Sequence, residues 1–113
     1  MKLIKAFVKP HKLESVTLAL RDVGGLSGAS VTDIRGFGRA GVHATGEPPA
    51  DDSLGLRPYA KLEIICDDGI VSEVIDAIRE AAHTGLRGDG KIFVSSIEQA
   101  VRISTGERGA QAV

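Results

Sequence analysis

A short glycine-rich segment, residues 84–91, combines the groups that could bind an anion. It reads TGLRGDGK, so Lys91 follows directly after the last glycine. Glycines leave backbone N–H groups uncovered, and successive N–H groups in a turn can form a concave nest for a phosphate or a carboxylate. Taken alone, the segment is explained equally well by a helix end and a tight turn with an incidental lysine.

Two patterns that resemble nucleotide-binding motifs fail on their context. Residues 85–92 come within one residue of the P-loop pattern, but Ile92 stands where a Ser or Thr would bind magnesium, and a strand is expected to follow. Residues 36–41 match G-x-G-x-x-G, but a proline-containing loop follows instead of the helix whose N-terminus would face a pyrophosphate. We therefore predict neither a P-loop nor a dinucleotide-binding fold.

Arginines outside the glycine-rich segment could complete a phosphate site. Arg102 and Arg108 add positive charge near the C-terminus, and Arg39 stands at the entrance of a long loop. If the strands that carry Arg39 and Lys91 lie near one another, within one chain or across a subunit boundary, the two cations would form a clamp for phosphate oxygens.

The sequence lacks the arrangements typical of a catalytic or metal centre. The histidines His11, His43 and His83 are widely separated, and no H-x-x-x-H or C-x-x-C spacing occurs. Cys66 ends the apolar face of a predicted strand, which favours a core residue over a nucleophile. We therefore expect no catalytic residues and no metal site.

Periodicity predicts two successive β-α-β units. Alternating apolar residues predict four strands, and apolar residues at helical spacing predict two helices. The strands are expected over 2–9, 29–38, 59–66 and 92–97, and the helices over 12–23 and 70–82. In the first strand, Ile4 and Val8 share one face, while Lys5 and Lys9 belong to the opposite face.

This order of elements predicts an α+β fold of the ferredoxin-like kind. In such a sandwich a four-stranded antiparallel sheet carries both helices on one face. Residues 1–113 are expected to form one domain, with a long loop over 39–57, of a length that is usually functional or mobile, and a polar tail over 105–113. Since the uncovered face of a small open sheet favours coverage by another subunit, we also expect a homo-oligomer.

Composition limits the possible partners. The chain has 113 residues, 42% of them hydrophobic, and a net charge of -1. Nothing global therefore favours binding to nucleic acid or to an anionic membrane surface. The single cysteine cannot form an internal disulfide, and the N-terminal residues lack the apolar stretch of a signal peptide, so we expect a cytoplasmic protein.

Five segments together, in order and spacing, resemble the PII nitrogen-regulatory signalling proteins. They are residues 36–39 (GFGR), the long loop, 61–64 (KLEI), 84–93 (TGLRGDGKIF) and 102–107 (RISTGE). The resemblance runs from Met1 to about Glu107. It implies a homotrimer of ferredoxin-like subunits that binds ATP, ADP or AMP in clefts between neighbouring subunits. It also implies that the function is binding and not catalysis, so that the protein is not an enzyme.

The resemblance also implies roles for individual residues. Gly88, Asp89, Gly90 and Lys91 would hold phosphates, and Arg102 would reach them from the neighbouring chain or the edge of the cleft. Gly36, Phe37, Gly38 and Arg39 would line the base of the loop. Glu63 and Ile65, with Gly28 and Ser30, would border the adenine and the ribose, and Ser30 stands where the family usually has Thr.

Other positions depart from the family pattern. Ala40 replaces a glutamine that helps to bind magnesium and 2-oxoglutarate, so the role of magnesium stays open. Tyr59 replaces a lysine that meets the 2-oxoglutarate carboxylate, Ser104 replaces an arginine, and Asp51-Asp52 occupies the region of a modifiable tyrosine. Because each lost cation could make charge-assisted hydrogen bonds of about 1.5–3 kcal/mol, we predict a weak or absent 2-oxoglutarate response.

The sequence therefore predicts a PII-like sensor that relays the phosphate state of a nucleotide through residues 39–57 to a transporter or a metabolic enzyme. One alternative is a ferredoxin-like RNA-binding module, but Phe7, Phe37, Phe93 and Tyr59 do not form the required aromatic pattern. Another is a small acylphosphatase-like enzyme, which would need an asparagine that the chain lacks. The preferred nucleotide, the target, any loop modification, and whether bicarbonate or another small anion replaces 2-oxoglutarate are left open.

Overall fold

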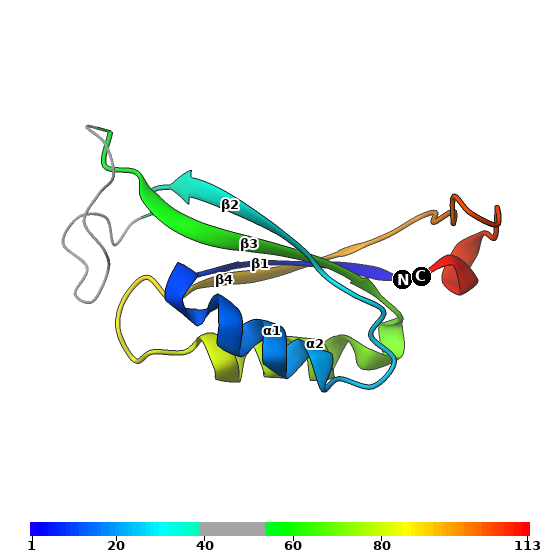
Figure 1. Cartoon of the computed structure of the whole chain (residues 1–113), viewed down its shortest axis with the longest axis horizontal. Helices are drawn as coiled ribbons and strands as arrows, with labels where there is room; N and C mark the ends of the chain where they lie inside the picture. The colour runs from blue at the N-terminus through cyan, green and yellow to red at the C-terminus, as the bar shows by residue number, and fades with distance from the viewer. Residues whose placement is uncertain (39–53) are drawn as a thin grey trace.

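The computed structural model of the chain describes residues 1–38 and 54–113, and Figure 1 shows its arrangement. Four strands and two α-helices follow one another as two β-α-β units. They are β1 Lys2–Val8, α1 Leu13–Arg21, β2 Ser30–Gly36, β3 Arg57–Cys66, α2 Val71–Ala82 and β4 Gly90–Ser96, with short 3-10 helices at Pro10–Lys12, Asp68–Ile70 and Gly109–Ala112.

The strands form one sheet in the order β2-β3-β1-β4, and every neighbouring pair is antiparallel. Both helices cover the same face of this sheet (Figure 1). The predicted ferredoxin-like α+β fold is therefore confirmed.

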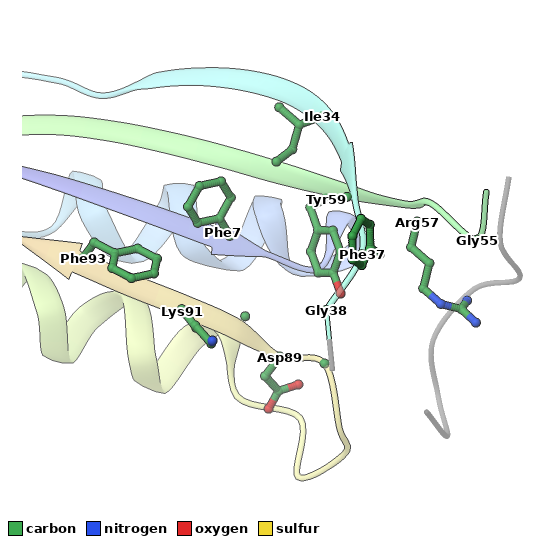
Figure 2. A pocket seen from close by; sticks show the side chains of 13 residues that line it. Phe7, Ile34, Phe37, Gly38, Gly55, Arg57, Tyr59, Asp89, Lys91 and Phe93 are labelled. Atoms are coloured by element: carbon green, nitrogen blue, oxygen red, sulfur yellow. The ribbon is translucent and has the colours of Figure 1, made fainter. Parts of the chain in front are cut away.

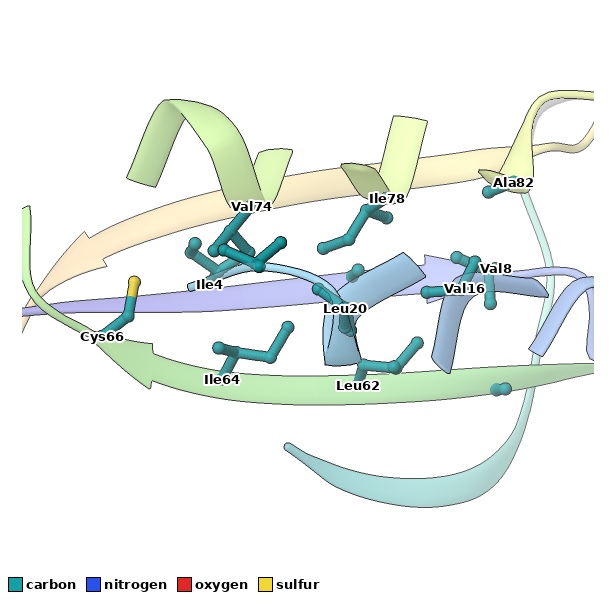
Figure 3. Packing of buried hydrophobic residues seen from close by; sticks show 13 residues of the cluster. Ile4, Val8, Val16, Leu20, Leu62, Ile64, Cys66, Val74, Ile78 and Ala82 are labelled. Carbon is teal, nitrogen blue, oxygen red and sulfur yellow. The ribbon is translucent and has the colours of Figure 1, made fainter. Parts of the chain in front are cut away.

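The core fills the layer between the sheet and the two helices (Figure 3). Every second residue of β1 and β3 faces the helices, because side chains alternate along a strand. The buried side chains from the strands are Ile4, Ala6, Val8, Ala60, Leu62, Ile64 and Cys66, and those from the helical layer are Val16, Leu20, Val23, Val74, Ile78 and Ala82. The core position predicted for Cys66 is thus confirmed.

The element boundaries differ from the expected ones at a few places. β3 begins at Arg57, which is buried, so the last residue of the predicted loop belongs to a strand. β4 begins at Gly90, two residues before the expected start. The predicted polar tail folds back on the chain, since Val101 and Arg108 form an isolated antiparallel bridge ahead of the last 3-10 helix. Residues 39–53 of the predicted loop lie outside the described residues.

The two ends of the sheet are different. The glycine-rich turn before β4 and the adjoining ends of β2 and β3 lie at one end, whereas residues 97–113 extend from the opposite end (Figure 1). On the face away from the helices, the rings of Phe7 and Phe93 meet edge to face with centroids 6.1 Å apart. Phe93 is 53% exposed there, and Ile65 is 40% exposed.

Candidate functional site

A cavity of about 470 Å³ lies where the glycine-rich turn approaches the ends of β2 and β3 (Figure 2). Its volume is within the range of about 300–1,000 Å³ that is usual for small-molecule sites. The cavity is lined by Phe7, Ile34, Gly36, Phe37, Gly38, Gly55, Arg57, Tyr59, Gly88, Asp89, Gly90, Lys91 and Phe93. The fold thus brings together the predicted site residues of two distant segments, 36–38 and 88–91.

The glycine-rich turn supplies the polar side of this cavity. Gly88 has a positive φ of 82°, a conformation that glycine adopts without steric cost. Among the described residues, the amide N–H groups of Arg87 and Gly88 donate no hydrogen bond. Lys91, the second residue of β4, is exposed. Free N–H groups next to an ammonium are the components of an anion site.

The shape of the turn is fixed by contacts between its two ends. The backbone N–H of Thr84 donates to Oδ2 of Asp89 at 2.9 Å, and the Thr84 hydroxyl donates to Oδ1. The amide of Leu86 in turn donates to the Thr84 hydroxyl oxygen at 3.0 Å. Since the Asp89 carboxylate is used inside the turn, any contact of Asp89 with a phosphate would come from its backbone.

The electrostatics of Asp89 agree with this arrangement. Burial alone would raise the pKa of the Asp89 carboxyl, but hydrogen bonds from Thr84 and the charge of Lys9 outweigh it, so the pKa lies below its usual value. His83 adds a contact, with Nδ1 3.3 Å from Oδ2 of Asp89. The carboxylate is therefore held in its ionised form by groups of this chain.

Lys9 is the residue of this region that the sequence interpretation missed. The alternation of β1 placed it on the face opposite Val8, yet its side chain is almost fully buried, with 1% exposure. Its ammonium lies 3.4 Å from Oδ1 of Asp89 and 3.4 Å from the Thr84 hydroxyl. The lysine directly before Pro10 was visible in the sequence, but its partners lie far along the chain.

Aromatic side chains form much of the remaining wall. Phe7 and Phe93 come from the open face of the sheet, and Phe37 and Tyr59 from the ends of β2 and β3 (Figure 2). Such a surface suits the flat face of a base or another planar group. Tyr59 lies in this wall, so at its position the lining is an aromatic ring with a hydroxyl group and not a cation.

The other predicted site residues lie elsewhere on the chain. Ser30 pairs with Glu63 six positions along β2 from Gly36, which at about 3.3 Å per residue is about 20 Å away. Gly28 precedes Ser30, and Ile65 follows Glu63 farther along β3. Arg39 lies outside the described residues. Within one chain, Gly28, Ser30, Glu63 and Ile65 do not line the cavity.

Arg102 belongs to the segment that extends from the opposite end of the sheet. Its guanidinium donates to the backbone carbonyl of Gln111 at 3.3 Å and lies 3.7 Å from a carboxylate oxygen of Glu107. The amide of Gly106 donates to the Arg102 carbonyl at 2.7 Å, which closes a tight turn. The arginine is thus held on a compact projecting hairpin, about half exposed.

Neither a metal-binding cluster nor a membrane-spanning helix is found in residues 1–38 and 54–113. No group of three His, Cys, Asp or Glu side chains there is placed to hold a metal ion. No helix among them has the length and apolar character needed to cross a membrane.

The fold and the cavity define a small α+β sandwich with a cavity between a glycine-rich turn and two strand ends. The family model for "Nitrogen regulatory protein P-II" matches residues 1–107. The chain is similar over its whole length, and over the whole length of each relative, to proteins of that name from Bradyrhizobium diazoefficiens (50% identical), Azospirillum brasilense (45%) and Haemophilus influenzae (44%). The chain therefore belongs to the PII family of nitrogen regulatory proteins.

Membership defines the general function. PII proteins are signalling regulators and not enzymes, so this chain is a signalling regulator. The family predicted from the sequence is confirmed. The family assignment replaces both alternatives, the RNA-binding module and the acylphosphatase-like enzyme.

Proposed function

We propose that this regulator binds an adenine nucleotide at sites built by neighbouring copies of the chain, and that it controls a transporter or a metabolic enzyme through residues 39–57. ATP, ADP and AMP are the candidate ligands. The observation that carries the proposal is the cavity itself, in which uncovered amides and Lys91 stand beside an aromatic wall. The amides and Lys91 suit phosphates, and the aromatic wall suits a base.

The position of the remaining predicted residues supports a site shared between copies. Neither Ser30 nor Glu63 lines the cavity: Ser30 lies four positions along β2 from Ile34, and Glu63 lies four positions along β3 from Tyr59, each about 13 Å at about 3.3 Å per residue. The hairpin with Arg102 projects at the far end. A second copy whose far end lay against the cavity of the first would bring these residues to the nucleotide.

The open face of the sheet supports association into a homotrimer. Phe93, Ile65 and Leu3 leave apolar surface uncovered on the face opposite the helices. A small domain gains stability when another subunit removes such a surface from water. Three copies arranged around a threefold axis would cover all three open faces and create three equivalent clefts.

The cavity also lies where the proposed regulatory segment leaves the sheet. Gly38 and Gly55, which both line the cavity, flank residues 39–54. A ligand with a γ-phosphate can contact the base of this segment, and a ligand without one cannot. Such differential contact is what shifts a population between two arrangements, and a protein target would bind one of them. We propose a cytoplasmic location for this regulator, since its one cysteine is buried and unpaired.

Calorimetric titration with ATP, ADP and AMP, each with and without magnesium and 2-oxoglutarate, tests the proposal. We expect binding to a trimer, and little change on addition of 2-oxoglutarate. Lys91→Gln should weaken ATP binding by at least about tenfold, since it removes a charge-assisted contact of about 1.5–3 kcal/mol. Arg21→Gln, which removes one positive charge from the exposed end of α1, is the matched control and should bind as the parent does.

The result that would overturn the proposal is a folded parent protein that gives no heat with any of the three nucleotides. If Lys91→Gln and the parent bound ATP with equal affinity, the phosphates would not lie at Lys91.

A further inference from the structure

Lys9 is the most deeply buried charged side chain of the described residues, at 1% exposure. A buried ammonium is retained only where partners compensate for the water it has lost. Both partners of Lys9 belong to the glycine-rich turn: Oδ1 of Asp89 and the hydroxyl of Thr84, each 3.4 Å from Nζ. Lys9 thus joins the end of β1 to a turn about 75 residues farther along the chain.

Asp89 presents a difficulty for an anion site. It lies between Gly88 and Gly90, and it lines the cavity together with Lys91. A carboxylate there repels phosphates, and in a partly buried site that repulsion is weakly screened. The structure resolves the difficulty by giving both carboxylate oxygens partners away from the cavity: Thr84 within the turn, and Lys9, which carries a fixed positive charge, from the end of β1.

We propose that Lys9 is a positioning residue of the phosphate-binding turn: its ammonium neutralises Asp89 and keeps the carboxylate within the turn, so that the cavity presents N–H groups and the charge of Lys91. This inference rests on the proposed nucleotide function. With Lys9 in place, Lys9, Arg87, Asp89 and Lys91 together leave a net charge of +2 at the turn. Without Lys9 that net charge falls to +1, and the Asp89 carboxylate loses the one ammonium that contacts it.

The proposal predicts an effect that depends on the charge of the ligand. Loss of Lys9 should weaken the binding of ATP, which carries the most phosphate charge, more than the binding of AMP, which carries the least. A purely structural role for Lys9 would instead damage the site for all adenine nucleotides alike. The ratio of the affinities for ATP and AMP therefore separates the two roles.

The experiment compares the parent, Lys9→Met, Asp89→Asn and the double variant by calorimetry with ATP and AMP, without magnesium. Lys12→Met, the same substitution three residues along the chain, is the matched control, and thermal unfolding verifies that each variant is folded. We expect Lys9→Met to weaken ATP binding by about tenfold, equivalent to about 1.4 kcal/mol. The same variant should weaken AMP binding by less than about threefold. The double variant should recover ATP binding to within about threefold of the parent, because no carboxylate is left to repel the phosphates.

Equal losses for ATP and AMP in Lys9→Met, a loss no greater than in Lys12→Met, or a double variant without recovery would each overturn the proposal. Failure of the folded parent to bind either nucleotide would overturn the proposed function and this inference with it. If Lys9→Met does not fold, Asp89→Asn decides the matter on its own. A rise in the ratio of ATP to AMP affinity supports the role given to Lys9, and an unchanged or lower ratio contradicts it.

Discussion

Gly90 lies directly against the backbone of Phe7, so that a Cβ atom on residue 90 would stand 1.6 Å from the carbonyl oxygen of Phe7. The backbone angle φ of Gly90 is 107°, a value that residues other than glycine rarely adopt. Gly90 is also the first residue of β4, where it pairs with Val8. This close approach fixes the start of β4 and with it the position of Lys91 at the cavity.

Gly90→Ala should therefore destabilise the fold and displace the turn. The added methyl group must push β4 away from β1 or force the backbone into strain, each at a cost of about 1–3 kcal/mol. We expect a fall of about 2–4 kcal/mol in the free energy of unfolding, measured by urea denaturation, and loss of nucleotide binding.

Gly24→Ala is the control for this substitution. Nothing lies within 4 Å of a Cβ at position 24, and its φ is not in the left-handed region. The stability of this variant should remain within about 0.5 kcal/mol of the parent. Equal stabilities for Gly90→Ala and Gly24→Ala would show that the start of β4 is not held by its approach to Phe7.

The Asp89 carboxyl should make the protein less stable in acid. Its pKa in the folded chain is lowered, because hydrogen bonds from Thr84 and the charge of Lys9 exceed the effect of burial. A group whose pKa is lower when folded stabilises the protein above its unfolded pKa, and this contribution is lost as pH falls through the folded pKa. The loss is expected below about pH 4, the ordinary range for an aspartate.

Denaturation curves between pH 2 and pH 7 for the parent and Asp89→Asn measure this contribution. The difference in stability between the two should shrink as pH falls, because both side chains are then uncharged. Asp68 has a lowered pKa as well, through a hydrogen bond with the N-terminal ammonium, but it is present in both proteins and cancels in the comparison. A difference that stays constant over the whole range would contradict the assignment.

Local periodicity was enough to predict the fold. The alternation through Ile4, Ala6 and Val8 and the helical spacing through Val74 and Ile78 both ended in the core, because burial of one face dominates the choice of element in a small domain. The glycine-rich turn around Gly88 could also be predicted, since glycines followed closely by a lysine indicate a turn with uncovered N–H groups whatever the rest of the chain does.

Contacts between distant segments could not be read in this way. Lys9 continues the polar face of β1 by alternation, and only the arrival of Thr84 and Asp89 explains its burial. The same limit applies to Gly90, whose approach to Phe7 depends on the pairing of β4 with β1. Long-range partners decide these positions, and periodicity contains no information about them.

Cys66 should be inert toward thiol reagents while the protein is folded. Burial raises the pKa of its thiol, the charge of Asp67 adds to the effect, and the side chain is only 2% exposed. The reactive species is the thiolate, so labelling by a disulfide reagent at pH 8 should be slow and should accelerate in urea in step with unfolding. Rapid labelling of the native protein, at the rate of the urea-unfolded chain, would place the thiol at the surface.

Phe93 should control assembly, because it is a large exposed ring on the open face, halfway along the edge strand β4. Phe93→Glu puts a charge on the surface that the neighbouring copies are proposed to cover, and burying an unpaired carboxylate costs several kcal/mol. Light scattering should show a smaller species than the parent trimer, and nucleotide binding should fall with it, since a shared cleft needs two copies. Leu18→Glu, at a leucine of similar exposure on α1, is the matched control and should leave assembly and binding intact. If Phe93→Glu kept the assembly of the parent, the open face would not be the subunit interface, and the site would have to be completed by another surface of the chain.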